Sequence, residues 1–110
     1  MNVPDVTVVT PSYMQRDYIE ETIQSVLQQK GVAIQYLVMD GGSTDGTLEI
    51  LEKYRDRLEF VSERDKGQTD AINKGFRRAK GRIVAFLNSD DFYLPGAVAA
   101  AVGFLDRHPE

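Results

Sequence analysis

Two adjacent carboxylates, Asp90 and Asp91, stand where an apolar segment of the sequence ends. Residues 82–87 before them are nearly all hydrophobic, and Asn88 and Ser89 lead from that segment to the two acids. Neighbouring carboxylates repel each other, and a strand needs no such pair to end. They suit a hard divalent cation such as Mg²⁺, which binds one or two carboxylates together with substrate phosphates. The alternative is an acidic, solvated turn, and these residues alone leave both interpretations open.

A further carboxylate, Asp40, follows another apolar segment and precedes two glycines, Gly41 and Gly42. A carboxylate in this place can accept hydrogen bonds from the N–H groups of a flat ligand, while the glycines let that ligand approach the backbone. This interpretation is favoured over an Asx turn, although each glycine taken alone could simply serve a turn with positive φ. The segment lacks the Lys-Ser/Thr of a P-loop and the GxGxxG spacing of a dinucleotide fold. It therefore identifies no ligand by itself.

Four apolar, β-rich segments must position these residues. Strands are expected over residues 6–10, 34–39, 58–62 and 82–87. The first, second and fourth are almost continuously hydrophobic, as in parallel strands that are covered on both faces. The third alternates more and is expected toward an edge of the sheet.

Segments with helical periodicity follow each strand. Asp17 is expected to be the N-cap of the first helix, in a capping box with Glu20, and Gly31 is expected to end the segment. Asp45 is expected to cap the second helix, and the fourth begins at about Gly96. The alternation of strands and helices predicts right-handed βαβ units, a parallel sheet and a Rossmann-like α/β/α fold. No linker divides residues 1–110, so a single domain is expected.

Polar and small residues follow all four predicted strands, over 10–13, 40–46, 63–68 and 88–91. In an open parallel sheet, ligands bind outside the carboxyl ends of the strands, where the strand order reverses. The sequence therefore predicts a ligand site at this edge.

Composition excludes several classes of protein. The net charge of −4, without a basic block, lacks the electrostatic signature of a nucleic-acid-binding protein. The absence of cysteine excludes disulfides, thiolate metal sites and a cysteine nucleophile. No apolar run approaches the roughly 20 residues of a membrane span, and Asp5 interrupts the N-terminus before any signal-peptide pattern. A domain in the cytoplasm is expected.

Four motifs together resemble the nucleotide-binding half of inverting family 2 glycosyltransferases with a GT-A fold. They are TPSY at 10–13, VMDGGSTDGT at 38–47, DKGQTDAINKG at 65–75 and FLNSDD at 86–91, in the order of the family. They cover most of the chain, and the combination is far more specific than any one motif. The resemblance implies four strands in the order 3-2-1-4. It also implies sugar transfer from a nucleotide-diphospho-sugar, most simply a UDP-sugar, to an acceptor hydroxyl in polysaccharide or glycoconjugate synthesis.

The resemblance also assigns roles at the site. Asp40 corresponds to the residue that contacts the base, usually uracil. The DxD motif of the family, which binds ribose and Mn²⁺ or Mg²⁺, reads Asn88-Ser89-Asp90 here, so its first acid is an amide and the metal role passes to Asp90, with Asp91 second. The implied nucleotide-binding residues are Thr10, Pro11, Tyr13, Asp40, Gly42, Asp70, Asn73, Asn88, Ser89 and Asp90.

In the family, the catalytic base and the acceptor site lie downstream of this region, so no residue of the chain is assigned as catalytic. The chain is interpreted as a fragment of a longer catalytic domain that is inactive alone. The alternative is a non-catalytic nucleotide-binding or assembly module left by truncation. Because further strands extend the sheet in the family, the open apolar surface predicts a homo-oligomer, most simply a symmetric dimer. The parent enzyme is expected in the cytoplasm or at the membrane surface.

Two other nucleotide- or phosphate-handling classes fit less well. A sugar-1-phosphate nucleotidyltransferase would carry a glycine-rich, basic loop after the first strand, and residues 10–16 lack those glycines. A phosphoacceptor receiver domain would have an aspartate at the end of the third strand, where Ser62 and Glu63 stand.

Overall fold

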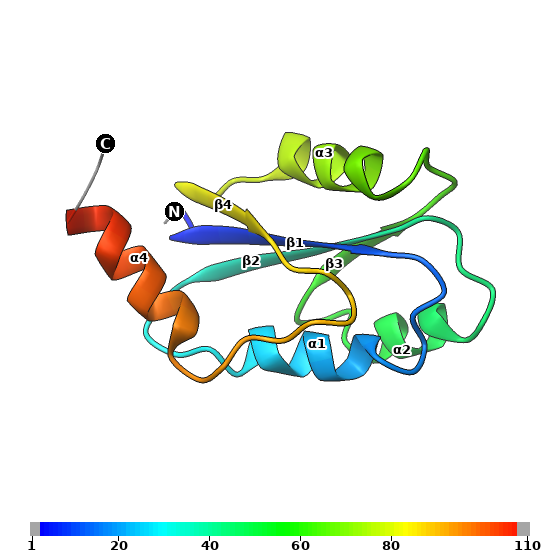
Figure 1. The fold of residues 1–110 in the computed structure, drawn as a ribbon, viewed down its shortest axis with the longest axis horizontal. Coiled ribbons are helices and arrows are strands. Elements are labelled where there is room, and N and C mark those ends of the chain that lie inside the picture. Colours follow the sequence, from blue (N-terminus) through cyan, green and yellow to red (C-terminus); the bar gives the residue numbers. More distant parts are fainter. Residues whose placement is uncertain (1–2, 108–110) are drawn as a thin grey trace.

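The computed structural model describes residues 3–107, which form one parallel sheet flanked by helices (Figure 1). The strands are β1 (Val6–Ser12), β2 (Ile34–Asp40), β3 (Glu59–Ser62) and β4 (Ile83–Phe86). The helices are α1 (Ile19–Leu27), α2 (Thr47–Lys53), α3 (Gln68–Arg78) and α4 (Ala97–Arg107). None of the helices within this range has the length and hydropathy of a membrane span.

The strand order is β3-β2-β1-β4 and all neighbouring strands are parallel, which confirms the predicted Rossmann-like fold and topology. Val9 in β1 lies opposite Leu37 in β2 and Phe86 in β4. At the carboxyl ends, Ser12 lies opposite Asp40, which in turn lies opposite Ser62 of β3. The polar segments after the strands therefore meet at one edge of the sheet. The alternating third strand lies at an edge, as expected.

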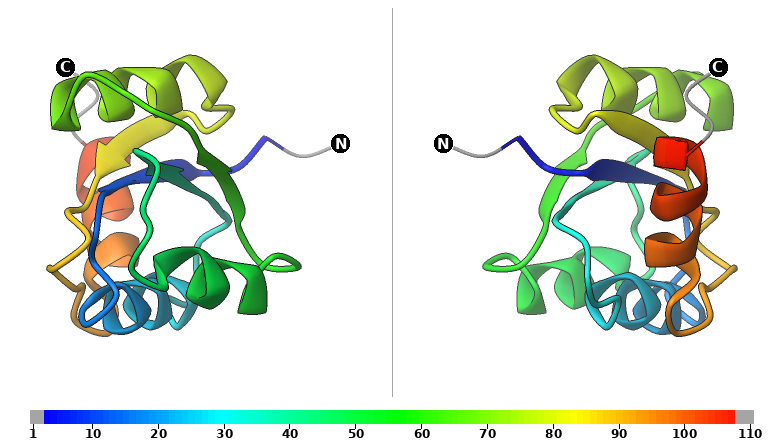
Figure 2. Two further views of the ribbon diagram at one scale, coloured as in Figure 1. Left: turned by 90° about the vertical axis from the view of Figure 1, so that its right-hand side faces the viewer. Right: turned by 90° about the vertical axis from the view of Figure 1, so that its left-hand side faces the viewer.

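Helices α1, α2 and α4 cover one face of the sheet and α3 covers the other (Figures 1 and 2). The larger core lies beneath α1, α2 and α4 and includes Val8, Ile23 and Leu51, all without exposed area. The core beneath α3 is smaller and consists of Val9, Leu37, Met39 and Ala71, with Val61 and Phe76 packed against it.

Helix α3 lies directly on β1 because of one glycine. A Cβ at Gly75 would lie 2.4 Å from Cγ1 and 2.9 Å from Cγ2 of Val9. Real side chains do not approach this closely, so the helix can keep its position only without a side chain here. The backbone of α3 thus packs directly on β1, and the carboxyl end of β1 lies at the predicted site.

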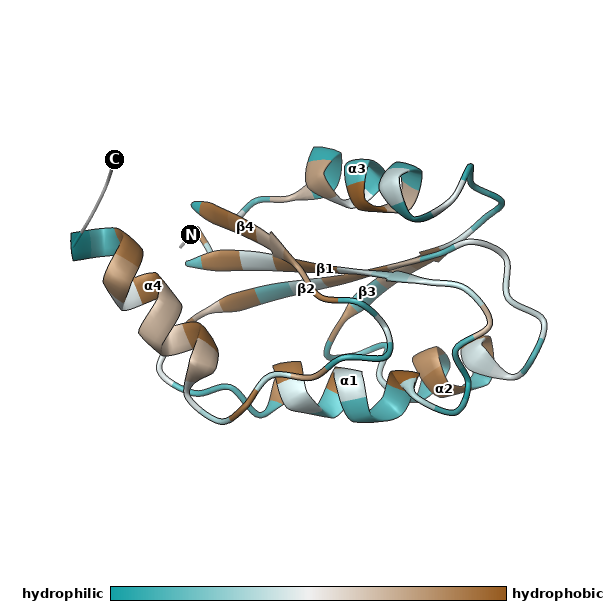
Figure 3. Cartoon of the chain, viewed as in Figure 1, coloured by the Kyte–Doolittle hydropathy of each residue, from teal (hydrophilic) through white to brown (hydrophobic). Residues whose placement is uncertain are grey.

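The prediction that β4 is covered on both faces is wrong. Val84 and Phe86 are 46% and 51% exposed, whereas Ile83 and Ala85 pack against the larger core. Helix α3 packs mainly on β1 and β2, and β4 is an edge strand, so Val84 and Phe86 are left about half exposed. Figure 3 shows the hydrophobic colouring of this strand. Self-association through exposed apolar surface stays a prediction.

The predicted capping box of α1 is also wrong. The N-cap is Tyr18, and no side chain caps this helix. Glu20 instead accepts hydrogen bonds from the Tyr54 hydroxyl and from Lys53 Nζ (3.1 Å), and these contacts, the Tyr54 bond above all, lower the pKa of Glu20. Its carboxylate therefore joins α1 to α2.

The prediction for α2 is displaced by one residue. Its N-cap is Gly46, with a φ of 105°, rather than Asp45. The Asp45 carboxylate nevertheless accepts bonds from the backbone N–H (3.1 Å) and hydroxyl (2.6 Å) of Thr47. The aspartate thus holds the first turn from the position before the cap.

Candidate functional site

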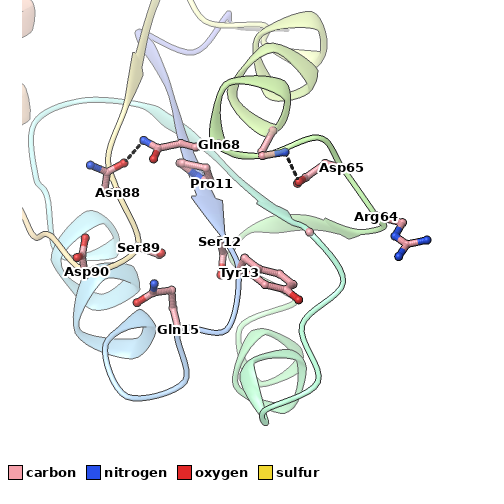
Figure 4. Close-up of a pocket in the computed structure, with 13 residues that line it drawn as sticks. Pro11, Ser12, Tyr13, Gln15, Arg64, Asp65, Gln68, Asn88, Ser89 and Asp90 are labelled. Carbon is pink, nitrogen blue, oxygen red and sulfur yellow. Dashed lines mark hydrogen bonds between the residues drawn. The ribbon is translucent and has the colours of Figure 1, made fainter.

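A cavity of about 550 Å³ opens at the carboxyl edge of the sheet, where the sequence predicted a ligand site (Figure 4). It receives residues from the segments that follow all four strands. Its lining consists of Pro11, Ser12, Tyr13, Gln15, Gly41, Arg64, Asp65, Gly67, Gln68, Ala71, Asn88, Ser89 and Asp90.

Ser12 at the end of β1 and Tyr13 just after it both line this cavity, but their side chains differ in exposure. The Tyr13 side chain is 60% exposed, so its ring is accessible to a ligand. The Ser12 hydroxyl is buried, and among the described residues it is the one buried side-chain oxygen or nitrogen without a hydrogen-bond partner. Thr10, in contrast, is fully buried and its hydroxyl lies 2.9 Å from that of Tyr36, so its side chain is outside the cavity.

The carboxylate of Asp40 organises the segment after β2. Its Oδ2 accepts bonds from the N–H groups of Gly42 (3.0 Å) and Ser43 (2.8 Å) and from the Ser62 hydroxyl (2.9 Å). Its Oδ1 accepts a bond from the Ser43 hydroxyl at 2.6 Å. Asp40 is only 2% exposed and, like Gly42, does not line the cavity, whereas Gly41 between them does.

The segment after β3 supplies a second carboxylate, Asp65, which is half-buried and lines the cavity. Its Oδ1 accepts a bond from the Gly67 N–H at 2.9 Å. A Cβ built on Gly41 would lie 2.9 Å from the other oxygen, Oδ2, so the carboxylate lies directly against the glycine.

Two polar residues of α3 that were predicted near the nucleotide lie outside the cavity lining. Asp70 accepts a bond from the Lys66 N–H at 2.9 Å and pairs with Lys74 at 3.6 Å. The backbone bond, followed by the nearby Lys74 ammonium, lowers the pKa of Asp70. Asn73 is exposed on the same helix. In this structure Asp70 holds the turn that leads into α3.

The segment after β4 is hydrogen-bonded to residues of both α3 and α1. The amide oxygen of Asn88 accepts a bond from Gln68 Nε2 at 2.6 Å (Figure 4). The hydroxyl of Thr22 in α1 lies 3.0 Å from the carbonyl oxygen of Ser89 and 2.5 Å from that of Asp91. The Asp90 side chain is exposed and lines the cavity, whereas Asp91 is exposed but does not. Within residues 3–107, no three metal-binding side chains of the His, Cys, Asp or Glu type form a group.

The structure thus brings together half of the predicted nucleotide-binding residues: Pro11, Tyr13, Asn88, Ser89 and Asp90. It places the other half outside the lining: Thr10, Asp40, Gly42, Asp70 and Asn73. The remaining lining residues were not named individually, although the segments 10–13, 40–46 and 63–68 were expected at this edge: Ser12, Gln15, Gly41, Arg64, Asp65, Gly67, Gln68 and Ala71. Most of these lie in segments that directly follow a strand, and this position was the signal that could have identified them.

A sequence profile described as Glycosyl transferase family 2 matches residues 7–110. The chain belongs to this family. The glycosyltransferase TuaG of Bacillus subtilis, which is named for teichuronic acid biosynthesis, is 48% identical over 92 residues. That alignment covers 80% of this chain and 36% of TuaG.

Solved structures agree with this family 2 assignment. S. aureus TarS 1-349 in complex with UDP superposes with a TM-score of 0.82 at 30% identity, over 96% of this chain and 33% of that one. The mannosyltransferase PcManGT from Pyrobaculum calidifontis, in complex with GDP-Man and Mn²⁺, has a TM-score of 0.83 at 28% identity, over 96% and 33%. The chain spans about a third of the length of TuaG, of TarS 1-349 and of PcManGT.

Proposed function

We propose that this chain is the nucleotide-sugar-binding part of an inverting glycosyltransferase that uses a UDP-sugar. The transferase would pass the sugar to an acceptor hydroxyl in polysaccharide or glycoconjugate synthesis. The observation that carries the proposal is the cavity at the carboxyl edge of the sheet, which gathers Pro11, Tyr13, Asn88, Ser89 and Asp90. Membership of family 2 and the UDP complex of TarS support it.

The lining divides naturally between a base and a diphosphate. The exposed ring of Tyr13 offers a stacking surface for a base. On the other side of the cavity lie Asn88 and Asp90, which we assign to the ribose and diphosphate (Figure 4). A direct contact between Asp40 and the base stays a prediction. The hydrogen bonds of its carboxylate support an indirect role, in which Asp40 fixes the loop around Gly41.

The Mn²⁺ or Mg²⁺ that the family resemblance implies fits the residues present only when the diphosphate shares in binding it. Asp90 offers a free carboxylate at the cavity, whereas the amide oxygen of Asn88 is engaged by Gln68 and Asp91 is outside the lining. One carboxylate with substrate phosphates and water is a usual ligand set for Mg²⁺. Asp90 is thus the proposed protein ligand, with Asp91 second. When bound, the metal would neutralise charge on the leaving nucleoside diphosphate.

The transfer itself requires groups that we do not assign to this chain. The acceptor hydroxyl would attack the anomeric carbon in line while the bond from that carbon to the diphosphate breaks, and a general base would take the hydroxyl proton. We propose that the base and the acceptor site belong to the part of the relatives that the chain does not span. The 110-residue chain should then bind nucleotide without detectable transfer.

Calorimetry with UDP, in Mn²⁺ and in chelator, tests this proposal. We expect a Kd on the order of 0.1–1 mM in Mn²⁺, or roughly 4–5.5 kcal/mol, and weaker binding in chelator because the diphosphate then meets an unscreened carboxylate. Asp90→Asn should remove most of this difference, and Asp56→Asn, an exposed aspartate outside the cavity, should keep it. No binding of UDP in Mn²⁺ would reject the proposed function. Equal binding in chelator would reject only the metal role of Asp90.

A further inference from the structure

Asp65 lines the cavity, but it is not among the residues that we assign to the diphosphate or to the metal. Its carboxylate lines the cavity, and one oxygen, Oδ1, accepts the Gly67 N–H. Within residues 3–107 no group donates a hydrogen bond to the other oxygen, Oδ2. Asp65 therefore keeps an acceptor available to a ligand, whereas both oxygens of Asp40 are occupied by the loop.

The position of Asp65 explains why residue 41 is a glycine. Gly41 does not adopt a positive φ, so its backbone conformation is open to other residues. A Cβ there would instead lie 2.9 Å from Oδ2 and 3.1 Å from Oδ1 of Asp65. The Gly41 N–H is held by the carbonyl oxygen of Ser12 at 2.9 Å, so the glycine is anchored in this place. The carboxylate from the third loop thus occupies the space that a side chain of the second loop would take.

Asp65 also lies on the side of the cavity that faces away from the proposed diphosphate site. In Figure 4, Asp65 and Tyr13 lie on one side, and Asn88 and Asp90 lie on the other. A nucleotide whose diphosphate lies at Asp90 and whose base stacks on Tyr13 would bring an edge of the base to Asp65.

We propose that Asp65 selects the base, because its carboxylate accepts the ring N–H of uracil or guanine. The inference rests on the proposed function and adds the residue that gives the site its specificity. An ionised carboxylate only accepts hydrogen bonds. Uracil N3 and guanine N1 carry a proton, whereas cytosine N3 and adenine N1 present a lone pair that the carboxylate would repel. A polar group that is left unpaired in a partly buried site discriminates strongly between such bases.

Calorimetric titrations with UDP, GDP, CDP and ADP in Mn²⁺ test the proposal and distinguish the two bases that share this chemistry. We expect UDP to bind about tenfold or more tightly than CDP and ADP, as for a hydrogen bond to a charged group. In Asp65→Asn the amide can donate as well as accept, so UDP and CDP should bind within about threefold of each other. Asp56→Asn serves as the control and should keep the wild-type preference.

A rescue variant separates selection by the carboxylate from a structural role in the loop. Asp65→Ala should lose the preference for UDP over CDP. Adding Gly41→Asp to Asp65→Ala should restore it, because the new carboxylate enters the space that Asp65 vacated. If Asp65 served only to hold Gly67, this second substitution would restore nothing.

The outcomes separate the inference from the function on which it rests. If wild-type chain binds none of the four nucleotides, both are rejected. If it binds UDP and Asp65→Ala keeps the same order of affinities, only the inference is overturned. A folded double variant that binds UDP without regaining the preference also overturns it. Circular dichroism confirms folding, and Asp65→Asn, which retains an acceptor for Gly67, replaces Asp65→Ala if the alanine variant unfolds.

Discussion

Asp40 and Asp65 lie at the same edge of the sheet, one at the end of β2 and the other in the loop after β3. Asp40 is 2% exposed and accepts four hydrogen bonds, from its own loop and from Ser62. Asp65 is half-buried, accepts one hydrogen bond from its loop and faces the cavity. The difference teaches that the role of an acidic residue after a strand depends on how many donors its own loop supplies. Asp40 stabilises the loop after β2 and joins it to Ser62, whereas Asp65 is available to a ligand.

Asp40→Ala should have the largest effect on stability. It leaves the N–H and hydroxyl of Ser43 buried without an acceptor, so we expect a loss of about 2–4 kcal/mol of unfolding free energy. Urea denaturation would measure this loss, and UDP binding should weaken both with and without metal. Asp65→Ala is the matched control and should lose less than about 1 kcal/mol. Equal losses in the two variants would remove the distinction between the carboxylates.

The two glycines after Asp40 offer a second, smaller contrast. Gly42 has a φ of 93°, so Gly42→Ala should strain the loop and lower stability by about 1–2 kcal/mol. Gly41→Ala should lower it less, because the new methyl meets the movable end of Asp65 rather than the backbone. It should instead displace the Asp65 carboxylate and reduce the preference for UDP over CDP. Thermal denaturation and calorimetry on both variants test this, and a larger stability loss at Gly41 would contradict it.

The smallest effect concerns the pH dependence of the loop after β2. The Thr47 hydroxyl, together with backbone bonds, lowers the pKa of Asp45 below its ordinary value of 3.8. The ionised form is therefore favoured in the folded chain, and its contribution is present above pH 3.8 and is lost as the pH falls through the lowered pKa. Asp45→Asn should make stability fall slightly less steeply below pH 3.8. Urea titrations at pH 3 and 5 would detect this, and parallel curves for wild type and variant would contradict it.

The sequence predicted the fold better than the site. Continuous apolar segments, polar strand ends and the family motifs together led to the correct parallel order. The exposure of Phe86 escaped this reasoning because a hydrophobic edge strand and a covered strand have the same composition. The side chain of Thr10 was misplaced because β1 continues to Ser12, so Thr10 lies inside the strand rather than at its end, and its hydroxyl lies against that of Tyr36. The approach of Asp65 to Gly41 is a contact between two loops that are distant in sequence, and no local pattern encodes it.

The contact of Gly75 with Val9 fixes more than the packing of one helix. Gln68 and Ala71, at the start of α3, line the cavity, and Gln68 lies seven residues before Gly75, which is roughly 10 Å along a helix. A methyl group at residue 75 would push α3 away from Val9, and the helix would tilt relative to β1. The tilt would change the depth of the cavity at the far end of α3. The absence of a side chain at Gly75 thus sets the distance between α3 and the carboxyl edge of the sheet, and with it the size of the cavity.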